Sequence, residues 1–288
     1  MKRNAIIIAA GTSSRFVPLS YEKPKGLVEV KGEVLIERQI LQLHEAGVDD
    51  VTIVVGYMAD QFAYLGEKYG VQFVLNEDYT RYNNTSSMIR VVDRLRNTFI
   101  CCSDQYYERN PFFQDLQQSA YAALYAEGQT NEYCLELDAE DSIRAVQIGG
   151  ADAWYMAGFA YFSEDFSMMF GEILTREYAY DETKQMYWED VYIKHLNELP
   201  TMQVVRFTDD ELREFDSLDE LRMFDKTYIA DTRSAIVKAI CQELQCRENK
   251  LTEFKKTKES KGLTFTFRYE GTEYLYKNGE ITKCSKRV

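Results

Sequence analysis

Histidine is scarce in this sequence, and none of its cysteines occur in a CxxC pair. There are two histidines, His44 and His195, and six cysteines without any CxxC spacing. A structural zinc site needs such ligands in close pairs, so the sequence predicts none. Free thiols of this kind are typical of a reducing cytoplasm, which is where we expect the protein to act. The cysteines are Cys101, Cys102, Cys134, Cys241, Cys246 and Cys284.

Long apolar runs are also missing. A membrane-spanning helix needs about 18 or more apolar residues, and no stretch of the sequence approaches that length. The N-terminus leads directly into a predicted strand and shows no signal-peptide pattern. We therefore expect a protein without a membrane span or a secretion signal.

Positive charge is scarce in most of the chain. The sequence has 47 Asp and Glu against 34 Lys and Arg, giving a net charge of −13. Residues 247–288 hold 11 basic and 6 acidic residues, whereas the other residues hold 23 and 41. Such an acidic surface repels nucleic acid, so no nucleic-acid partner is expected. An anionic ligand would have to be met by a local group of cations and by a metal ion.

Apolar strands alternate with amphipathic helices in the first part of the chain. This alternation predicts an α/β fold with a mostly parallel, Rossmann-like sheet flanked by helices. The strands are predicted at 5–8, 51–55, 71–75 and 98–102, and the helices at 34–46, 58–69 and 86–96. Further strands are predicted near 119–126, 132–137, 142–148, 153–162 and 204–207, with helices near 164–177, 186–198 and 218–229.

A domain boundary is predicted at residue 231. Residues 1–230 would form the main domain, and residues 231–288 a small α+β appendage. The appendage begins with a short helix, and its alternating segments on either side of Glu270-Gly271 predict a hairpin.

The clearest chemistry lies in residues 4–27, NAIIIAAGTSSRFVPLSYEKPKGL. A buried strand runs into small loop residues, whose backbone N–H groups can approach a phosphate closely. Three cations follow within one short connection: Arg15, Lys23 and Lys25. These residues fit both a seat for a nucleoside triphosphate and an ordinary βα turn with solvated lysines. Neither GxxxxGK[ST] nor GxGxxG is present, which argues against P-loop and dinucleotide sites.

The order AAGTSSRFVPLS…KPKGLV resembles the opening motif of nucleotidyltransferases, roughly AAGxGxRxxPLT…PKxLV. Ser13 departs from it, because the family usually has a second glycine there and a positive φ is costly for serine. The resemblance implies catalytic roles for Arg15 and Lys25, which would neutralise charge around the phosphates. It also implies nucleotide binding by Ala9, Ala10, Gly11, Thr12, Ser13 and Ser14.

Later motifs narrow this resemblance. GYMADQF, GVQFVLNEDYTRYNN, SDQYYERN, TNEY, YWED and EFDS follow in the order seen in bacterial CTP:phosphocholine cytidylyltransferases. That family would transfer CMP from CTP to phosphocholine, giving CDP-choline and pyrophosphate. By the same resemblance Asn83, Asn84 and Ser87 contact cytosine or ribose, although these residues equally fit a turn and a helix start.

Carboxylates in the same motifs suggest a magnesium site. Asp104 follows the strand at 98–102, at the edge of the sheet where ligands bind in open parallel sheets. On position alone, Asp104 also fits the start of a turn. A second ligand comes from YWED, where the choline branch of the family aligns Glu189 with the metal and leaves Asp190 as an alternative.

Aromatic residues are candidates for binding the amine. A trimethylammonium group donates no strong hydrogen bonds, so its pocket is expected to be aromatic with carboxylates nearby. Aromatic residues make up 14% of the chain, which makes chance placement a serious alternative. Tyr133 stands where the family often has Trp. The candidates are Tyr133, Trp154, Tyr155, Tyr187 and Trp188.

Residues 231–288 resemble the start of bacterial choline kinases, but no catalytic loop follows, so a remnant or docking module is expected instead of kinase activity. Two rivals to a phosphocholine enzyme stay open. One is a cytidylyltransferase for 2-aminoethylphosphonate or phosphoethanolamine, and the other is a non-catalytic nucleotide-binding regulator. The sequence leaves the oligomeric state open and allows a homo-oligomer.

Overall fold

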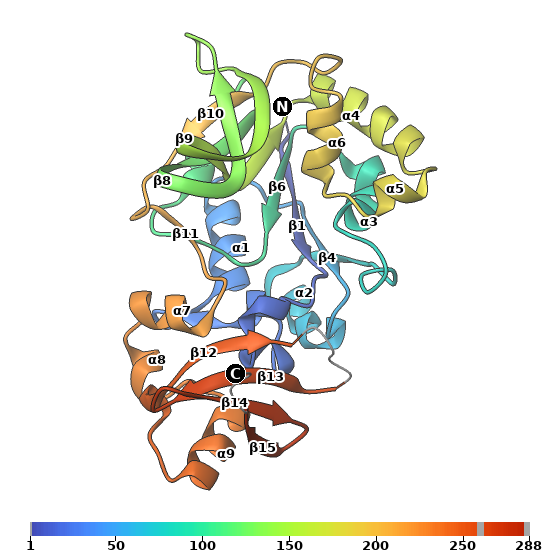
Figure 1. The fold of residues 1–288 in the computed structure, drawn as a ribbon. Coiled ribbons are helices and arrows are strands. Elements are labelled where there is room, and N and C mark those ends of the chain that lie inside the picture. Colours follow the sequence, from blue (N-terminus) through green and yellow to red (C-terminus); the bar gives the residue numbers. More distant parts are fainter. Residues whose placement is uncertain (1, 258–261, 285–288) are drawn as a thin grey trace. The chain divides into compact units, whose positions relative to one another are not determined.

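The computed structural model describes residues 2–257 and 262–284, and the chain divides into two compact units (Figure 1). The first unit contains Met1–Gly11 and Leu35–Glu214, and the second contains Thr12–Val34 and Phe215–Val288. This division differs from the predicted boundary at residue 231, because an early segment of the chain packs with the C-terminal part.

The first unit is built on a seven-stranded sheet with the strand order β10-β8-β9-β6-β1-β4-β5. Apolar, β-branched runs form its centre, where β1, β4, β5 and β6 pair in parallel. The predicted α/β fold with a mostly parallel sheet is therefore confirmed. These four strands span Asn4–Ala9, Val51–Val55, Gln72–Leu75 and Thr98–Cys102.

The other half of the sheet is a long antiparallel ribbon. Strands β8 (Ala120–Leu137) and β9 (Ile143–Phe162) each cover two segments that the sequence predicts as separate strands. Shifts in register keep the ribbon paired across its irregular positions. Strand β9 runs antiparallel to β6, and β10 (Gln203–Arg206) runs parallel to β8. Two short strands, β7 (Gln105–Tyr107) and β11 (Leu212–Glu214), form a separate pair.

Helices cover this sheet, with α3 to α6 gathered on one side of it and α1 away from them (Figure 1). Apolar residues of this group, including Met88, Phe166 and Trp188, are buried in one core. The predicted helices at 58–69 and 86–96 are each partly 3₁₀ helix, as η4 (Ala59–Phe62) and η5 (Ile89–Arg94). The α-helices are α1 (Leu35–Glu45), α2 (Tyr64–Tyr69), α3 (Thr85–Met88), α4 (Glu164–Glu177), α5 (Asp181–Lys184) and α6 (Trp188–Lys194).

The second unit carries a four-stranded antiparallel sheet in the order β12-β13-β14-β15. The predicted hairpin is confirmed as β13 and β14. Glu270 and Gly271 join the strands in a tight two-residue turn with φ values of 47° and 72°. The strands are β12 (Leu251–Lys256), β13 (Thr264–Tyr269), β14 (Thr272–Lys277) and β15 (Glu280–Lys283). The helices are α7 (Leu218–Phe224), α8 (Thr227–Ala230) and α9 (Ala235–Leu244), with η7 at Glu248–Lys250.

The segment Thr12–Val34 belongs to the second unit because side chains fasten it there. The Tyr21 hydroxyl donates to the Thr264 carbonyl oxygen at 2.9 Å, and its ring lies 6.2 Å from that of Phe265. The Glu22 carboxylate accepts the Ala235 N–H at 2.7 Å and thereby caps the start of α9. The segment consists of 3₁₀ turns η1 (Ser14–Phe16), η2 (Leu19–Tyr21) and η3 (Lys25–Leu27), then β2 (Glu29–Val30) and β3 (Glu33–Val34).

The structure also bears on the cysteines and on membrane-spanning helices. All six cysteines are free thiols in the structure. Within residues 2–257 and 262–284, no helix combines the length and apolar character that crossing a membrane requires.

We predict that Gly158→Ala destabilises the first unit more than Gly128→Ala does. Both glycines have a positive φ (82° and 75°), which costs an L-residue about 1–2 kcal/mol. A Cβ atom at Gly158 would lie 2.7 Å from Leu212 Cδ2, whereas at Gly128 it would meet no atom within 4 Å. Urea unfolding should show an additional loss of about 1–3 kcal/mol for Gly158→Ala. Equal losses for the two variants would contradict this account.

Candidate functional site

The carboxyl edge of the parallel strands carries the predicted metal residue Asp104. Strands β1 and β6 are parallel neighbours, so the Ala9–Gly11 stretch and the turn after β6 leave the sheet at the same edge. The Ser103 N–H donates to the Ile8 carbonyl oxygen at 3.1 Å, which fixes the start of this turn beside β1. Asp104 is the next residue, and it is partly exposed.

Glu189 is a poorly hydrated carboxylate at the start of α6. One of its oxygens accepts from the Tyr121 hydroxyl at 3.2 Å, and the other from Asn84 Nδ2 at 3.4 Å. Burial raises the pKa of Glu189 to about 7, although these hydrogen bonds act in the opposite direction. The side chain thus holds a charge that the surrounding protein compensates only in part.

Asp190 has different surroundings from Glu189. Its Oδ1 accepts from the Tyr133 hydroxyl at 2.8 Å, and its Oδ2 accepts from the Tyr187 N–H at 2.8 Å. The second bond closes the first turn of α6, as an acidic residue at this position commonly does. Asp190 therefore orients a tyrosine and stabilises a helix end.

A third carboxylate joins Asp104 and Glu189. Burial raises the pKa of the Cys102 thiol, and the negative charges of Asp104, Glu214 and Glu189 raise it further. All three carboxylates therefore lie close enough to Cys102 to influence its ionisation. Glu214 ends β11 and accepts from Gln105 Nε2 at 3.1 Å. Its only signal in the sequence is its place at the start of EFDS.

The donor set fits Mg²⁺. Among residues 2–257 and 262–284, no three His, Cys, Asp or Glu side chains form a ready-made metal cage. Mg²⁺ does not require one, because it is commonly held by one or two carboxylates together with substrate phosphates and water. Asp104 and Glu189 offer hard oxygen ligands, and a divalent cation would favour the ionised form of the Glu189 carboxyl, whose pKa burial raises.

The predicted base-contact residues are engaged in local hydrogen bonds. Asn84 Oδ1 accepts the Trp188 N–H at 2.7 Å, so this side chain helps to start α6. Asn83 Oδ1 accepts the Asn84 N–H at 2.9 Å, and Ser87 Oγ accepts from Asn76 Nδ2 at 3.0 Å. The structure thus displays the turn and helix start that were the alternative interpretation of these residues.

The aromatic candidates fall into three places. Trp188 is 2% exposed and packs against Tyr121, Phe162 and Phe170, with ring centroids 5.4–5.9 Å apart. Its ring therefore belongs to the core, and its faces are covered by other aromatic rings. Tyr133 and Tyr187 lie at the start of α6, where both bond to Asp190.

Trp154 and Tyr155 occupy the third place, a cavity of about 580 Å³ along the β8–β9 ribbon. Trp154 makes an edge-to-face contact with Tyr125 at 5.4 Å, and Arg206 lies 5.0 Å over its ring. Burial raises the pKa of Tyr155 to about 12, with further increases from the charges of Asp209, Glu132 and Glu214. The cavity is also lined by the acidic residues Glu127, Glu132 and Asp209.

The second unit contains the predicted catalytic cations, which share one acidic partner. Arg15 Nη1 lies 2.7 Å from Asp216 Oδ2, and Lys25 Nζ lies 3.5 Å from Asp216 Oδ1. Lys25 is 5% exposed and lies 5.7 Å over the Phe16 ring, whereas the Arg15 side chain is 78% exposed. Ser13 has φ 47°, so a serine here adopts the left-handed conformation that glycine adopts at lower cost. Asp216, the third residue of EFDS, was not predicted as a partner of these cations.

Comparisons with known proteins identify the family to which this chain is similar. Residues 5–146 match a family model described as a MobA-like NTP transferase domain. The choline-phosphate cytidylyltransferase of Streptococcus pneumoniae is 32% identical over 222 residues, which cover 77% of this chain and 96% of that protein. The 2-aminoethylphosphonate cytidylyltransferase of Lancefieldella rimae is 35% identical over 237 residues, covering 81% of this chain and 96% of that protein.

A solved structure agrees with these sequence relatives. The CTP:phosphocholine cytidylyltransferase of Streptococcus pneumoniae aligns with a TM-score of 0.76 at 32% identity. The alignment covers 79% of this chain and 99% of that one. About a fifth of the present chain therefore has no counterpart in these relatives.

We predict that Glu189→Gln makes the metal-free protein less sensitive to pH. A carboxyl whose pKa is higher in the folded state binds protons more tightly there, so its contribution to stability falls between about pH 4.5 and about pH 7. Glutamine at position 189 cannot ionise. As the pH rises across that interval, the free energy of unfolding of the variant should therefore increase by up to about 3 kcal/mol relative to that of the unsubstituted protein. Urea unfolding with a chelator at about pH 5 and about pH 8 measures this change.

Glu140→Gln, which neutralises an exposed carboxylate, serves as the matched control. A stability difference between Glu189→Gln and the original that stays constant with pH would contradict the burial account.

Proposed function

Because this chain belongs to the nucleotidyltransferase family, we propose that it transfers CMP from CTP to phosphocholine in the presence of Mg²⁺. The relatives support the cytidylyl group, since both of those described above are cytidylyltransferases. The observation that carries the proposal is the acidic pair Asp104 and Glu189, associated with the edge of the sheet where the β1 loop begins.

The reaction is an in-line displacement at phosphorus. An oxygen of the acceptor phosphate forms a bond to the α-phosphorus of CTP, and the bond from that phosphorus to the α–β bridging oxygen breaks. Pyrophosphate leaves with the bonding electron pair, and CDP-choline is the other product. The acceptor oxygen is already anionic near neutral pH, so no general base is required, and catalysis depends on positioning and charge stabilisation.

Four residues of this chain have proposed roles in that step. Arg15 and Lys25 would bind phosphate oxygens and neutralise the charge that develops as pyrophosphate leaves. Asp104 and Glu189 would hold Mg²⁺, which supplies Lewis-acid stabilisation of the phosphate oxygens when bound. Asp216 would keep both cations oriented, since it lies within 3.5 Å of each.

The amine is best assigned to the start of α6. Only two carbon atoms separate the phosphate oxygen of phosphocholine from its nitrogen, so the amine must bind close to the metal carboxylates. Tyr133, Tyr187 and Asp190 adjoin Glu189 and offer aromatic faces with a negative charge. Both oxygens of Asp190 already accept hydrogen bonds. A quaternary ammonium, which needs no acceptors, suits this setting better than a primary one.

One observation favours 2-aminoethylphosphonate as a second candidate acceptor. The relative with that activity has the higher identity of the two described, 35% against 32%. The aromatic group near Glu189 is also small, because Trp188 is buried in the core and Trp154 lines another cavity. A primary ammonium would then bind to Glu214 or Asp190 by charge-assisted hydrogen bonds.

We predict that Asp104→Ala lowers turnover of CTP and phosphocholine by a factor of about 100 or more. The variant lacks one of the two carboxylates proposed to hold Mg²⁺, so higher Mg²⁺ concentrations should restore part of the activity. Pyrophosphate release measured over a Mg²⁺ titration tests both points. Asp93→Ala removes an exposed carboxylate and should change neither. Original protein that binds CTP without releasing pyrophosphate would indicate a non-catalytic regulator.

We predict that Tyr133→Trp shifts acceptor preference towards phosphocholine. The larger indole ring gives a quaternary ammonium a stronger cation–π contact. The substitution also removes the Tyr133 hydroxyl, which donates a hydrogen bond to Asp190. The ratio of kcat/KM for phosphocholine to that for 2-aminoethylphosphonate should rise about fivefold to thirtyfold, as about 1–2 kcal/mol implies. Tyr125→Trp, in the ribbon cavity, is the control. An equal shift in that control would place the amine there instead.

A further inference from the structure

A cavity of about 800 Å³ in the second unit adjoins Arg15. This volume lies within the range of about 300–1,000 Å³ that is typical of small-molecule sites. Strand β12 forms one wall with Phe254, Lys255 and Lys256, followed by Thr257, and the start of α7 forms another. The cavity therefore combines a residue of the nucleotide motif with residues from the predicted C-terminal appendage.

An irregularity in β12 immediately precedes the two lysines that line this cavity. The register between β12 and β13 shifts between Thr252 and Lys255, and Glu253 has φ 51°. The Glu253 N–H donates to Asp219 Oδ2 at 2.8 Å, which fastens the bulged residue to α7. Beyond the bulge, Lys255 and Lys256 pair in regular register with Thr266 and Phe265, and both line the cavity at this end of β12.

The acidic residues of the cavity are committed to other partners. Asp216 pairs with Arg15 at 2.7 Å, and Glu220 accepts from the Asp216 N–H and the Ser217 hydroxyl, both at 2.9 Å. Lys255 has only a weak, exposed pair with Glu253 at 3.2 Å. Positive charge is therefore available to a ligand in this cavity, while the negative charge is used within the protein.

Two further features suit an anion with several oxygens. Thr257 Oγ1 is buried and has no hydrogen-bond partner among the residues that the structure describes, so it can donate to a ligand. No ion pair involving Lys256 occurs among those residues, and its side chain is exposed. Lysine binds phosphate as a compact charge with three donors.

We propose that this cavity is a subsite for the pyrophosphate portion of the nucleoside triphosphate, with Lys255 and Lys256 as its cations. The inference rests on the proposed function and adds to it the C-terminal part of the chain as a contributor to nucleotide binding. Arg15 belongs to both sites, because it lines this cavity and is part of the loop proposed to bind the phosphates. The same two lysines would hold the pyrophosphate product before it dissociates.

The double variant Lys255→Ala/Lys256→Ala tests this subsite. We expect KM for CTP to rise about tenfold, because charge-assisted contacts to phosphate are lost, while KM for the acceptor stays unchanged. Isothermal titration with inorganic pyrophosphate and Mg²⁺ should show a similar loss of affinity. Lys255→Arg/Lys256→Arg, which keeps both charges, should retain most of that affinity.

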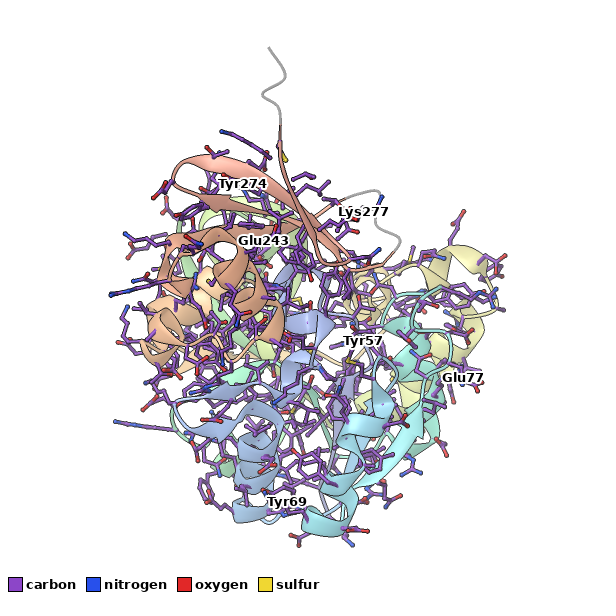
Figure 2. All side chains as sticks on the ribbon, turned by 90° about the horizontal axis from the view of Figure 1, so that it is seen from below. Tyr57, Tyr69, Glu77, Glu243, Tyr274 and Lys277 are labelled. Atoms are coloured by element: carbon purple, nitrogen blue, oxygen red, sulfur yellow. The ribbon has the colours of Figure 1, made fainter. Side chains whose placement is uncertain are left out.

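The matched control is Lys250→Ala/Lys277→Ala. These lysines belong to the same unit, are exposed and do not line the cavity, and Lys277 stands on β14 (Figure 2). Thermal melting of each variant checks that it folds. Unchanged KM for CTP and unchanged pyrophosphate affinity in the Lys255/Lys256 variant would overturn the inference. So would an equal loss in the control, since that would reflect only the general charge of this region.

The titration separates this inference from the proposed function. If the original protein turns over no amine phosphate but binds pyrophosphate through these two lysines, the proposed function fails and the subsite stands. If it turns over CTP normally while the lysine variant behaves like the original, the subsite fails and the proposed function stands. If the original protein binds no pyrophosphate, the subsite also fails.

Discussion

A carboxylate held largely out of water beside other carboxylates is the constraint on which the proposed site depends. Glu189 is half-buried at the start of α6, and the preceding Trp188 is packed in the aromatic core. The resulting cost appears as a pKa of about 7 for Glu189. A divalent cation would reverse that cost, since it favours the ionised carboxylate. A bound cation would therefore compensate the charge of Glu189 better than the surrounding protein does.

The same helix start connects distant parts of the first unit. Asn84, which precedes α3, bonds to both the Trp188 N–H and the Glu189 carboxylate. Tyr121 and Tyr133 on β8 donate to Glu189 and Asp190. These bonds orient each acidic residue separately, so two neighbouring carboxylates have different surroundings. Glu189, the proposed metal ligand, therefore differs from Asp190, whose two oxygens accept hydrogen bonds from Tyr133 and Tyr187.

The sequence predicted the elements whose pattern is local. Strand bounds at 51–55 and 98–102 were correct, because short apolar runs end at clear loop residues. The irregular ribbon was not predicted as continuous. Gly128 and Gly149 resemble breaks between strands, whereas positive φ values and register shifts carry the pairing past them. The burial of individual aromatic residues could not be predicted either. Nothing local in YWED shows that Trp188 lies in the core while Tyr187 is 47% exposed.

Contacts between segments that are distant in sequence explain why the two units do not divide at residue 231 as predicted. The same contacts let the C-terminal part of the chain support the loop that contains Arg15 and Lys25. Tyr21 and Glu22 lie between Arg15 and Lys25 in the nucleotide motif, yet both bond to residues beyond position 230. The loop that carries Arg15 and Lys25, the cations proposed to act in catalysis, is therefore shaped partly by a region of the chain remote in sequence. A change in the packing of β13 or α9 must alter the free energy of that loop's conformations, since the hydrogen bonds are shared. The part of the chain beyond residue 230 is thus physically coupled to the loop that carries Arg15 and Lys25, within the same unit.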